Sequence, residues 1–222
     1  MLVTKHFVFV HLPKTGGDFI RRLCILHLPG DWIVEHDLGK HAGDHRIPEE
    51  YRDLPRFGLI RNPWSWYVSL HHYNLGTGRP PQHRERIDDR NWLTASDNGA
   101  NDFKTTLVNI LSGWIYNQKL AARMLERDVD LLTIFHDDRF SRSLREDRIT
   151  IGKVESLRSD FLAFLEANEV PVPEPFREAI QNRPPINVSE HQSYQDYYDE
   201  ESRNLLAHKA RYLIDRYGYE FE

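Results

Sequence analysis

The residues best suited to chemistry stand near the start of the chain, in a Pro-Lys-Thr-Gly-Gly run at residues 13–17. A β-branched, apolar stretch precedes this run, and an apolar pattern of helical period follows it from about Gly17 to Leu28. A glycine turn between a strand and a helix offers backbone N–H groups and the positive end of the helix dipole to an anion. A lysine and a hydroxyl in the same turn predict binding of a phosphate or sulfate group.

The order of residues in this turn excludes two better-known phosphate loops. Lys14 precedes Gly16 and Gly17, whereas the lysine of the G-x-x-x-x-G-K-[ST] loop follows its glycines. The run also lacks the G-x-G-x-x-G spacing of dinucleotide-binding turns. Taken alone, it is also compatible with a plain turn in which Lys14 is solvated.

A second candidate anion site follows another strand-like segment at residues 56–61. Arg61 ends that segment, and Pro63 is placed to begin the next helix. The guanidinium of Arg61 can bind phosphate through two parallel hydrogen bonds, and Ser69, eight residues later, could add a hydroxyl. The alternative is a buried arginine paired with a carboxylate, together with a surface serine. Two anion sites at the carboxyl ends of strands favour a ligand with two separated phosphate groups.

At this point the chain resembles the sulfotransferases that use 3′-phosphoadenosine 5′-phosphosulfate (PAPS), and in particular their bacterial and Golgi-type carbohydrate members. Residues 13–17 resemble the family's 5′-phosphosulfate loop, and Arg61-Asn62-Pro63 with Ser69 resembles its 3′-phosphate motif. Three further stretches add to the resemblance: Gly39-Lys40-His41-Ala42, residues 151–161, and the aromatic tail at residues 197–199 and 215–221.

The resemblance implies roles for the matching residues. Lys14 would hold the phosphosulfate oxygens and neutralise the leaving group during transfer. The remaining cofactor contacts would come from the turn and the first helix (Thr15, Gly16, Gly17, Asp18, Phe19), from the 3′-phosphate motif (Arg61, Ser69) and from the late strand (Lys153). The implied reaction moves a sulfuryl group from PAPS to a hydroxyl, or secondarily to an amine, and requires no metal.

An acceptor hydroxyl also needs a base, and His41 is the first candidate because imidazole titrates near neutral pH. His45 is the second, followed by Glu35 and Asp37. The alternatives are that both histidines serve packing or the surface, or that they bind a metal, for which no third ligand is evident. His72, Tyr73 and residues 76–102 are candidates for the lining of the acceptor site.

Two positions depart from the family pattern. Asp18 stands where members usually have Thr or Ser, so either it points away and caps the helix, or it weakens cofactor binding, or the chain has lost catalysis. Trp66 stands where the 3′-phosphate motif usually has Arg. A catalytically silent PAP- or PAPS-binding module and a nucleotide-dependent kinase of related fold therefore remain alternatives.

The elements that must position these residues alternate along the chain, which favours a three-layer α/β fold with a mainly parallel sheet, of the P-loop-kinase-like sulfotransferase type. We expect a single domain over residues 1–222. The expected strands span residues 6–12, 32–35, 56–61, 130–135 and 149–154. Helices are expected at 17–28, 64–75 and 103–127, around 157–165 and around 205–214. Residues 76–102 predict a mobile or substrate-facing loop, and the proline-rich residues 170–187 a second one.

Composition limits the remaining possibilities. A length of 222 residues suits one domain, and a net charge of −5 with a pI near 6.2 argues against a general nucleic-acid binder. The single cysteine, Cys24, excludes an internal disulfide and lies in an apolar helical run. No apolar run is long enough to span a bilayer and no signal peptide is evident, so we expect a cytoplasmic protein.

Overall fold

The structure is a computed structural model that describes residues 1–35, 38–74, 102–186 and 191–222. The chain divides into two compact units. Unit 1 comprises Met1–Arg61 and Phe135–Ile186, and unit 2 comprises Asn62–Ile134 and Asn187–Glu222. The expectation of a single domain over residues 1–222 stays a prediction.

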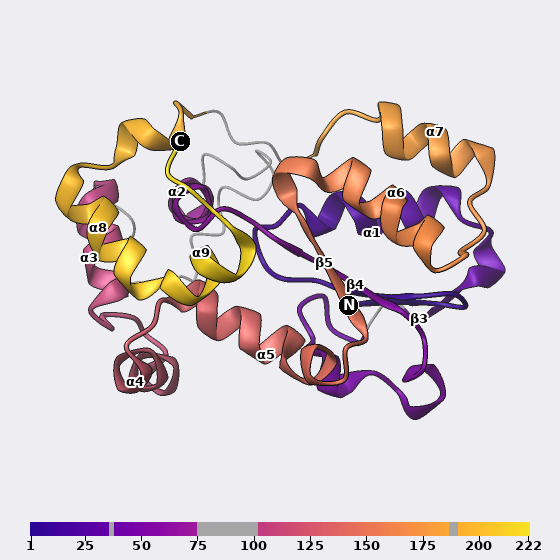
Figure 1. The fold of residues 1–222 in the computed structure, drawn as a ribbon, viewed down its shortest axis with the longest axis horizontal. Coiled ribbons are helices and arrows are strands. Elements are labelled where there is room, and N and C mark those ends of the chain that lie inside the picture. The colour runs from indigo at the N-terminus through magenta and orange to yellow at the C-terminus, as the bar shows by residue number, and fades with distance from the viewer. Residues whose placement is uncertain (36–37, 75–101, 187–190) are drawn as a thin grey trace. The chain divides into compact units, whose positions relative to one another are not determined.

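Unit 1 contains a five-stranded sheet with the strand order β3-β1-β2-β4-β5 (Figure 1). The strands are β1 (Leu2–Thr4), β2 (Val8–Val10), β3 (Ile33–Glu35), β4 (Arg56–Ile60) and β5 (Ile149–Lys153). The pairs β2–β4 and β4–β5 are parallel, and β1 is antiparallel to both of its neighbours. Four strands therefore run in one direction and only β1 runs in the other, which confirms a mainly parallel sheet. The short strand β1 was missed in the sequence.

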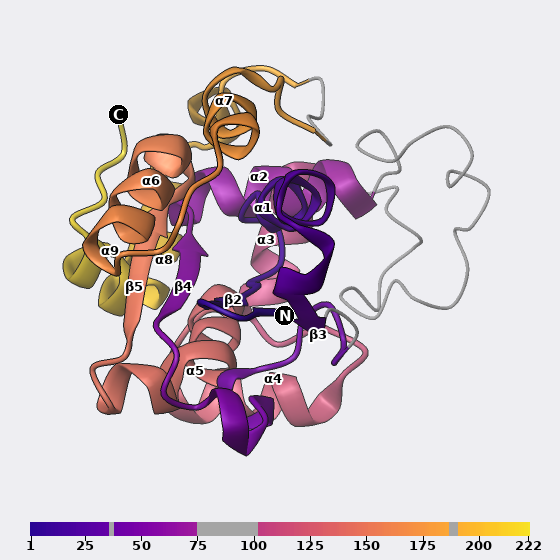
Figure 2. The same ribbon diagram turned by 90° about the vertical axis from the view of Figure 1, so that its right-hand side faces the viewer.

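Helices cover both faces of this sheet. Helices α1 (Gly17–His27), α6 (Leu157–Ala167) and α7 (Glu174–Asn182) lie over one face, as Figures 1 and 2 show. The part of α5 (Leu131–Arg145) that belongs to unit 1 lies over the other face. Between the sheet and α6, aromatic rings pack at centroid distances of 5.0–5.9 Å, those of Phe7, Phe57, Phe161 and Phe164. Burial of each such ring contributes about 1.5–3 kcal/mol. The expected three-layer α/β architecture is confirmed.

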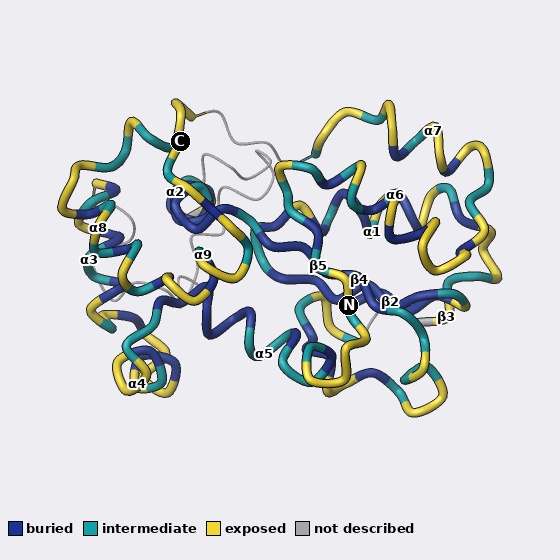
Figure 3. Tube along the Cα trace, viewed as in Figure 1, coloured by how far each residue is buried: buried dark blue, intermediate teal, exposed yellow. Residues whose placement is uncertain are grey.

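Two of the strands that carry the site, β2 and β4, are buried along their length (Figure 3), whereas β5 is partly exposed. Arg56, at the start of β4, is only 1% exposed and holds the strand against the end of α5. Its guanidinium donates to Ser143 Oγ at 2.8 Å and to Glu146 Oε2 at 2.9 Å. Arg142 and Arg56 together lower the pKa of Glu146 to about 2. Strand β4 thus contains a buried arginine, Arg56, that pairs with a carboxylate.

Unit 2 contains α2 (Pro63–Asn74), α3 (Phe103–Leu111), α4 (Gln118–Arg127), the start of α5, α8 (Glu200–Lys209) and α9 (Arg211–Tyr217). The C-terminal tail packs on α2, where the ring centroids of Phe221 and Trp64 are 5.4 Å apart. Tyr198 donates its hydroxyl hydrogen to the Trp64 carbonyl at 2.9 Å.

Short 3-10 turns in both units complete the described elements: η1 (Gly30–Trp32), η2 (Asp44–Arg46), η3 (Glu49–Tyr51), η6 (Val154–Ser156) and η7 (Tyr194–Tyr197).

The strand expected at residues 130–135 is wrong, because this segment begins α5. A short, continuous apolar run fits a buried helix as well as a buried strand. The fully buried Asp130 decides between them, since its carboxylate accepts hydrogen bonds from the Thr133 backbone N–H at 2.9 Å and from the Thr133 hydroxyl. The Leu131 N–H donates to the Tyr67 hydroxyl at 3.0 Å. The carboxylate therefore works as a helix N-cap.

Three further expectations about helices need correction. The helix expected over 103–127 is two helices, because Gly113 has a φ of 79° and Asn117 caps α4 through the Leu120 N–H. The C-terminal helix likewise divides into α8 and α9. The proline-rich segment 170–187 contains α7, whose Pro175 lies in the first turn, where a missing N–H costs no helical hydrogen bond. In the described part of the chain, no helix is long and apolar enough to cross a membrane.

Two Asp-x-x-Thr caps in unit 2 allow a matched test of the buried one. We expect Asp130→Ala to lower the free energy of unfolding by about 2–4 kcal/mol, because it removes an N-cap and leaves buried donors without an acceptor. The control is Asp102→Ala in α3, where the same cap on Thr105 is exposed. It should cost only about 1 kcal/mol or less. Urea unfolding measures both, and equal losses would contradict the assignment.

Candidate functional site

The carboxyl ends of three parallel strands meet at one edge of the sheet in unit 1. Ile60, the last residue of β4, pairs with Lys153, the last residue of β5. Arg61 follows Ile60 directly, and residues 13–16 follow the neighbouring parallel strand β2. Adjacent strands lie about 4.8 Å apart. The structure therefore places the Lys14 turn, Arg61 and Lys153 along the same edge, as two separated anion sites require.

The turn between β2 and α1 has an unusual backbone. Gly16 is the N-cap of α1 with a φ of 70°, and Lys14 also lies in the left-handed region with a φ of 64°. Such a conformation is costly for a lysine and often marks a functional site. A Cβ on Gly17 would lie 2.1 Å from the His11 ring, so only glycine fits there. No side chain caps the helix, and its N-terminal turn is therefore a suitable anion site.

Two of the sequence-predicted residues turn their side chains into the protein. Thr15 is fully buried and donates its hydroxyl hydrogen to the Leu12 carbonyl at 2.7 Å. Phe19 is 6% exposed and packs in the core, with the Arg158 guanidinium 4.8 Å from its ring centroid. Both side chains therefore face the interior, and the Phe19 N–H donates to the Gly16 carbonyl at 2.9 Å. A contact of Thr15 or Phe19 with a cofactor stays a prediction.

A second tight turn, at residues 39–42, comes close to the first. The Ala42 N–H donates to the Gly39 carbonyl at 2.9 Å, which leaves Lys40 and His41 as the central residues. Lys40 Nζ lies 2.7 Å from Asp18 Oδ1 and 2.8 Å from Asp18 Oδ2. Asp18 is therefore not the cap of α1, a position that Gly16 occupies. Its carboxylate lies in the first turn of the helix and forms an ion pair with Lys40.

His41 contacts a second histidine that the sequence reasoning missed. The centroid of its ring lies 4.6 Å from that of His11, which is 3% exposed and packs beneath Gly17. Burial and the positive charges of Lys40 and Arg139 lower the pKa of His41 to about 4. Burial also lowers the pKa of His11. Both rings are therefore neutral at pH 7. The position of His11, just before Leu-Pro-Lys at the end of a strand, is the sequence signal that could have identified it.

The other candidate bases are placed differently. His45 is exposed, and nothing is described for the Glu35 side chain or for Asp37, which lies outside the described residues. Among these candidate bases, His41 is the one whose surroundings are best defined.

Among the residues that the structure describes, no group of three or more His, Cys, Asp or Glu side chains could hold a metal ion.

In the Arg61-Asn62-Pro63 motif that follows β4, Asn62 and Pro63 begin helix α2. Asn62 Oδ1 accepts a hydrogen bond from the Trp64 N–H at 3.0 Å, and Asn62 Nδ2 donates to the Glu220 carbonyl at 3.0 Å. Asn62 thus caps α2, and Pro63 is its first residue. Arg61 itself is half-buried at the edge of unit 1.

Farther along α2 in unit 2, the expected site residues lie partly in the core. Ser69 is buried, and Trp66 is fully buried with its ring centroid 4.9 Å from that of Tyr67. His72 Nε2 lies 2.8 Å from the Tyr197 hydroxyl, while Tyr73 is 40% exposed. The rest of the expected acceptor lining, residues 76–101, lies outside the described residues.

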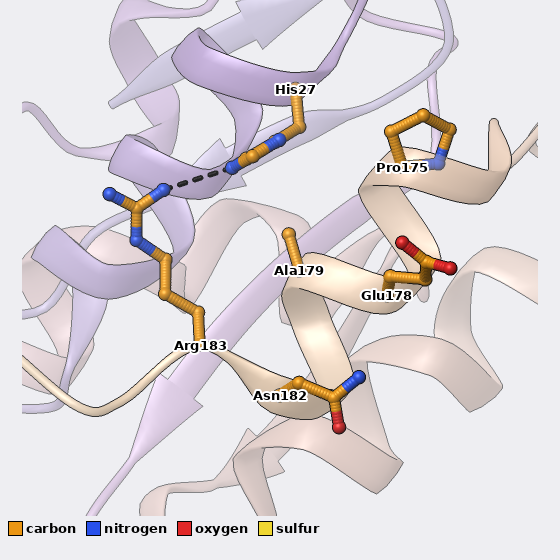
Figure 4. Close-up of a pocket in the computed structure, with 6 residues that line it drawn as sticks. All are labelled: His27, Pro175, Glu178, Ala179, Asn182 and Arg183. Carbon is orange, nitrogen blue, oxygen red and sulfur yellow. Dashed lines mark hydrogen bonds between the residues drawn. The ribbon is translucent and has the colours of Figure 1, made fainter.

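A separate open cavity lies elsewhere on unit 1 (Figure 4). It has a volume of about 430 Å³ and is lined by His27, Pro175, Glu178, Ala179, Asn182 and Arg183. Arg183 Nη1 lies 2.9 Å from His27 Nε2 across its wall. Because His27 ends α1 and the anion turn begins it, about 15 Å of helix separate the two places. This cavity is therefore not part of the candidate site.

A comparison with solved structures supports this architecture, whereas comparisons of the sequence find no match. No protein-family model matches the chain, and no curated protein matches it in sequence. A solved structure, mouse sulfotransferase SULT7A1 complexed with PAP, is similar in fold, with a TM-score of 0.52 and 12% sequence identity. The similarity covers 97% of this chain and 88% of the mouse protein. At that identity the likeness shows the fold alone, and the chain has a sulfotransferase fold.

Proposed function

We propose that this chain is a sulfotransferase that moves a sulfuryl group from PAPS to a hydroxyl of a carbohydrate, lipid or small molecule and releases PAP. The observation that carries the proposal is the single sheet edge that holds the Lys14 turn, Arg61 and Lys153. A fold similar to that of a PAP-bound sulfotransferase supports it. The Lys-His-Ala stretch at residues 40–42 favours a bacterial or Golgi-type carbohydrate enzyme.

The chemistry of the donors suits a nucleotide with two phosphate groups. The uncapped first turn of α1 and the Lys14 cation would bind the 5′-phosphosulfate. Arg61 would bind the 3′-phosphate through its planar guanidinium. The hydroxyl contact expected of Ser69, in unit 2, stays a prediction. Lys153, at the end of β5, would border the adenosine. The negative charge of Asp18 does not oppose this assignment, because Lys40 neutralises it.

In the proposed reaction the acceptor oxygen bonds to sulfur as the bond from sulfur to the bridging phosphate oxygen breaks. The departing electron pair stays on the 5′-phosphate of PAP. Lys14 would stabilise that growing charge, and the backbone N–H groups of Gly16 and Gly17 would hold the phosphate in line. Catalysis of this kind depends on positioning and on charge stabilisation, as in phosphoryl transfer.

His41 would take the proton of the acceptor hydroxyl. Its ring is neutral at pH 7 because burial and nearby cations lower its pKa to about 4. A pKa this low makes a weak base, but the negative charge of a bound phosphosulfate would raise it toward neutrality. A base is most effective when its pKa lies near the working pH. Cosubstrate binding would thus prepare His41 for proton transfer.

Incubation with radiolabelled PAPS and a panel of hydroxyl acceptors tests the function directly. Transfer of label to an acceptor is the expected result. Binding of PAP without transfer, together with transfer by an Asp18→Thr variant, would identify a silent binding module. Thermal stabilisation by ATP–Mg²⁺ but not by PAP would instead favour a kinase and overturn the proposal.

Lys14→Ala should lower kcat by about 10²–10³-fold, because one cation that stabilises developing charge is lost. The free energy of unfolding should change by less than about 0.5 kcal/mol, as for a substitution outside the core. Steady-state kinetics and urea unfolding measure the two effects. Lys5→Ala, which removes another lysine of unit 1, is the control and should leave kcat unchanged. A loss of stability typical of a core substitution would argue against the catalytic role.

Arg61→Ala should weaken PAP binding by about tenfold to a hundredfold, the usual effect of losing a charged hydrogen bond to phosphate. Binding of adenosine 5′-phosphosulfate should change little, since that ligand has no 3′-phosphate. Isothermal titration calorimetry gives both affinities. The control is Arg148→Ala, which removes a surface ion pair with Asp53. If both ligands lost affinity equally, Arg61 would not bind the 3′-phosphate.

His41→Asn should lower kcat by about 10²–10⁴-fold while the affinity for PAP stays within about twofold, because the ring acts on the acceptor proton. The acid limb of the pH–kcat profile should disappear with it. His45→Asn removes the exposed histidine four residues away and serves as the control. An unchanged pH profile in the His41 variant would assign the base to another residue.

A further inference from the structure

The family resemblance assigned no role to Lys40, which forms an ion pair with Asp18 in the first turn of α1. We propose that Lys40 is a second cation of the 5′-phosphosulfate site, presented to the anion by Asp18. This inference rests on the proposed function, since it concerns the same bound nucleotide. It adds a binding residue from a segment distant in sequence from the Lys14 turn.

The first support for this role is the position of the ion pair at the N-terminal end of α1. Asp18 lies in the first turn of α1, the end of the helix that attracts anions. Lys40 Nζ lies within 2.8 Å of both oxygens of the Asp18 carboxylate. The ammonium group is therefore at the helix end where a phosphate would bind, beside the turn that holds Lys14.

The backbone around Lys40 supports a fixed location for its side chain. The 39–42 turn is closed by the hydrogen bond from the Ala42 N–H to the Gly39 carbonyl. The next residue, His41, packs its ring against His11, which in turn lies beneath Gly17. Lys40 and the anion turn are thus connected through two side-chain contacts, one ionic and one between rings.

The second support is that the ion pair is uncharged overall and accessible to a ligand. An unpaired carboxylate in this turn would repel a phosphosulfate, whereas the pair has no net charge. The side chains of Lys40 and Asp18 are 45% and 34% exposed, so a ligand can reach them. An ammonium group has three N–H donors. Lys40 can keep its bond to Asp18 and donate another hydrogen to an anion oxygen, and Asp18 then acts as a positioning residue.

The test compares four proteins: the wild type, Lys40→Met, Asp18→Asn and the double variant. Titration calorimetry with PAP and with adenosine 3′-monophosphate, which has no 5′-group, reports on the 5′ site. We expect Lys40→Met to weaken PAP binding by about tenfold to a hundredfold when Asp18 is present, as for loss of a charge-assisted hydrogen bond. In the Asp18→Asn background the loss should be smaller but still measurable, because Lys40 keeps its charge and loses only its positioning partner. The affinity for adenosine 3′-monophosphate should not change.

Two other outcomes would overturn the inference while the proposed function stands. A loss of affinity only when Asp18 is present would mean that Lys40 merely neutralises the carboxylate. An equal loss for both ligands, or none, would mean that Lys40 does not contact the 5′-group. If the wild type failed to bind PAP at all, the proposed function itself would fail.

The matched control is Lys5→Met. Lys5 forms an ion pair of similar length, 2.8 Å, with Asp31 in the same unit, and its side chain is 50% exposed. The Lys5→Met substitution removes the same charge as Lys40→Met and leaves the first turn of α1 unchanged. PAP affinity should stay at the wild-type value, and thermal unfolding of every variant checks that each protein is folded.

Discussion

The close contact between the His11 ring and the backbone of Gly17 is the constraint on which the candidate site depends. A Cβ at residue 17 would overlap that ring, so helix α1 can start directly above the end of β2 only with glycine there. The left-handed φ of Gly16 completes the reversal from strand to helix. This short connection aims the N-terminus of α1 at the sheet edge where Arg61 and Lys153 also lie.

The balance of charge around this turn follows from the same packing. The only acidic side chain in the first turn of α1, Asp18, is paired with Lys40. His11 and His41 are held neutral by burial and by neighbouring cations. The turn therefore combines a positive helix end and the Lys14 cation with an acid that is already neutralised. A phosphosulfate could bind there without the Asp18 carboxylate having to take up a proton.

Buried polar groups hold the surrounding elements in register. Arg56 joins β4 to the end of α5 through Ser143 and Glu146, and in unit 2 the Asp130 carboxylate caps the start of α5. Such groups cannot remain unpaired in the interior without a large cost. They also explain why the aromatic core alone does not define the elements: an apolar run shows that a segment is buried, whereas the capping group selects its conformation.

The sequence by itself determined the α/β class and the order of strand, turn and helix within residues 6–28, because hydrophobic period and turn residues act locally. The two anion motifs that it predicts stay predictions. The sequence also indicated His41. Only the tertiary structure decided that residues 130–135 begin a helix, that Thr15 bonds inside its turn, and that Lys40 pairs with Asp18. These outcomes depend on which groups meet across long stretches of chain. Local patterns cannot carry that information, since burial and hydrogen-bond partners are set by packing.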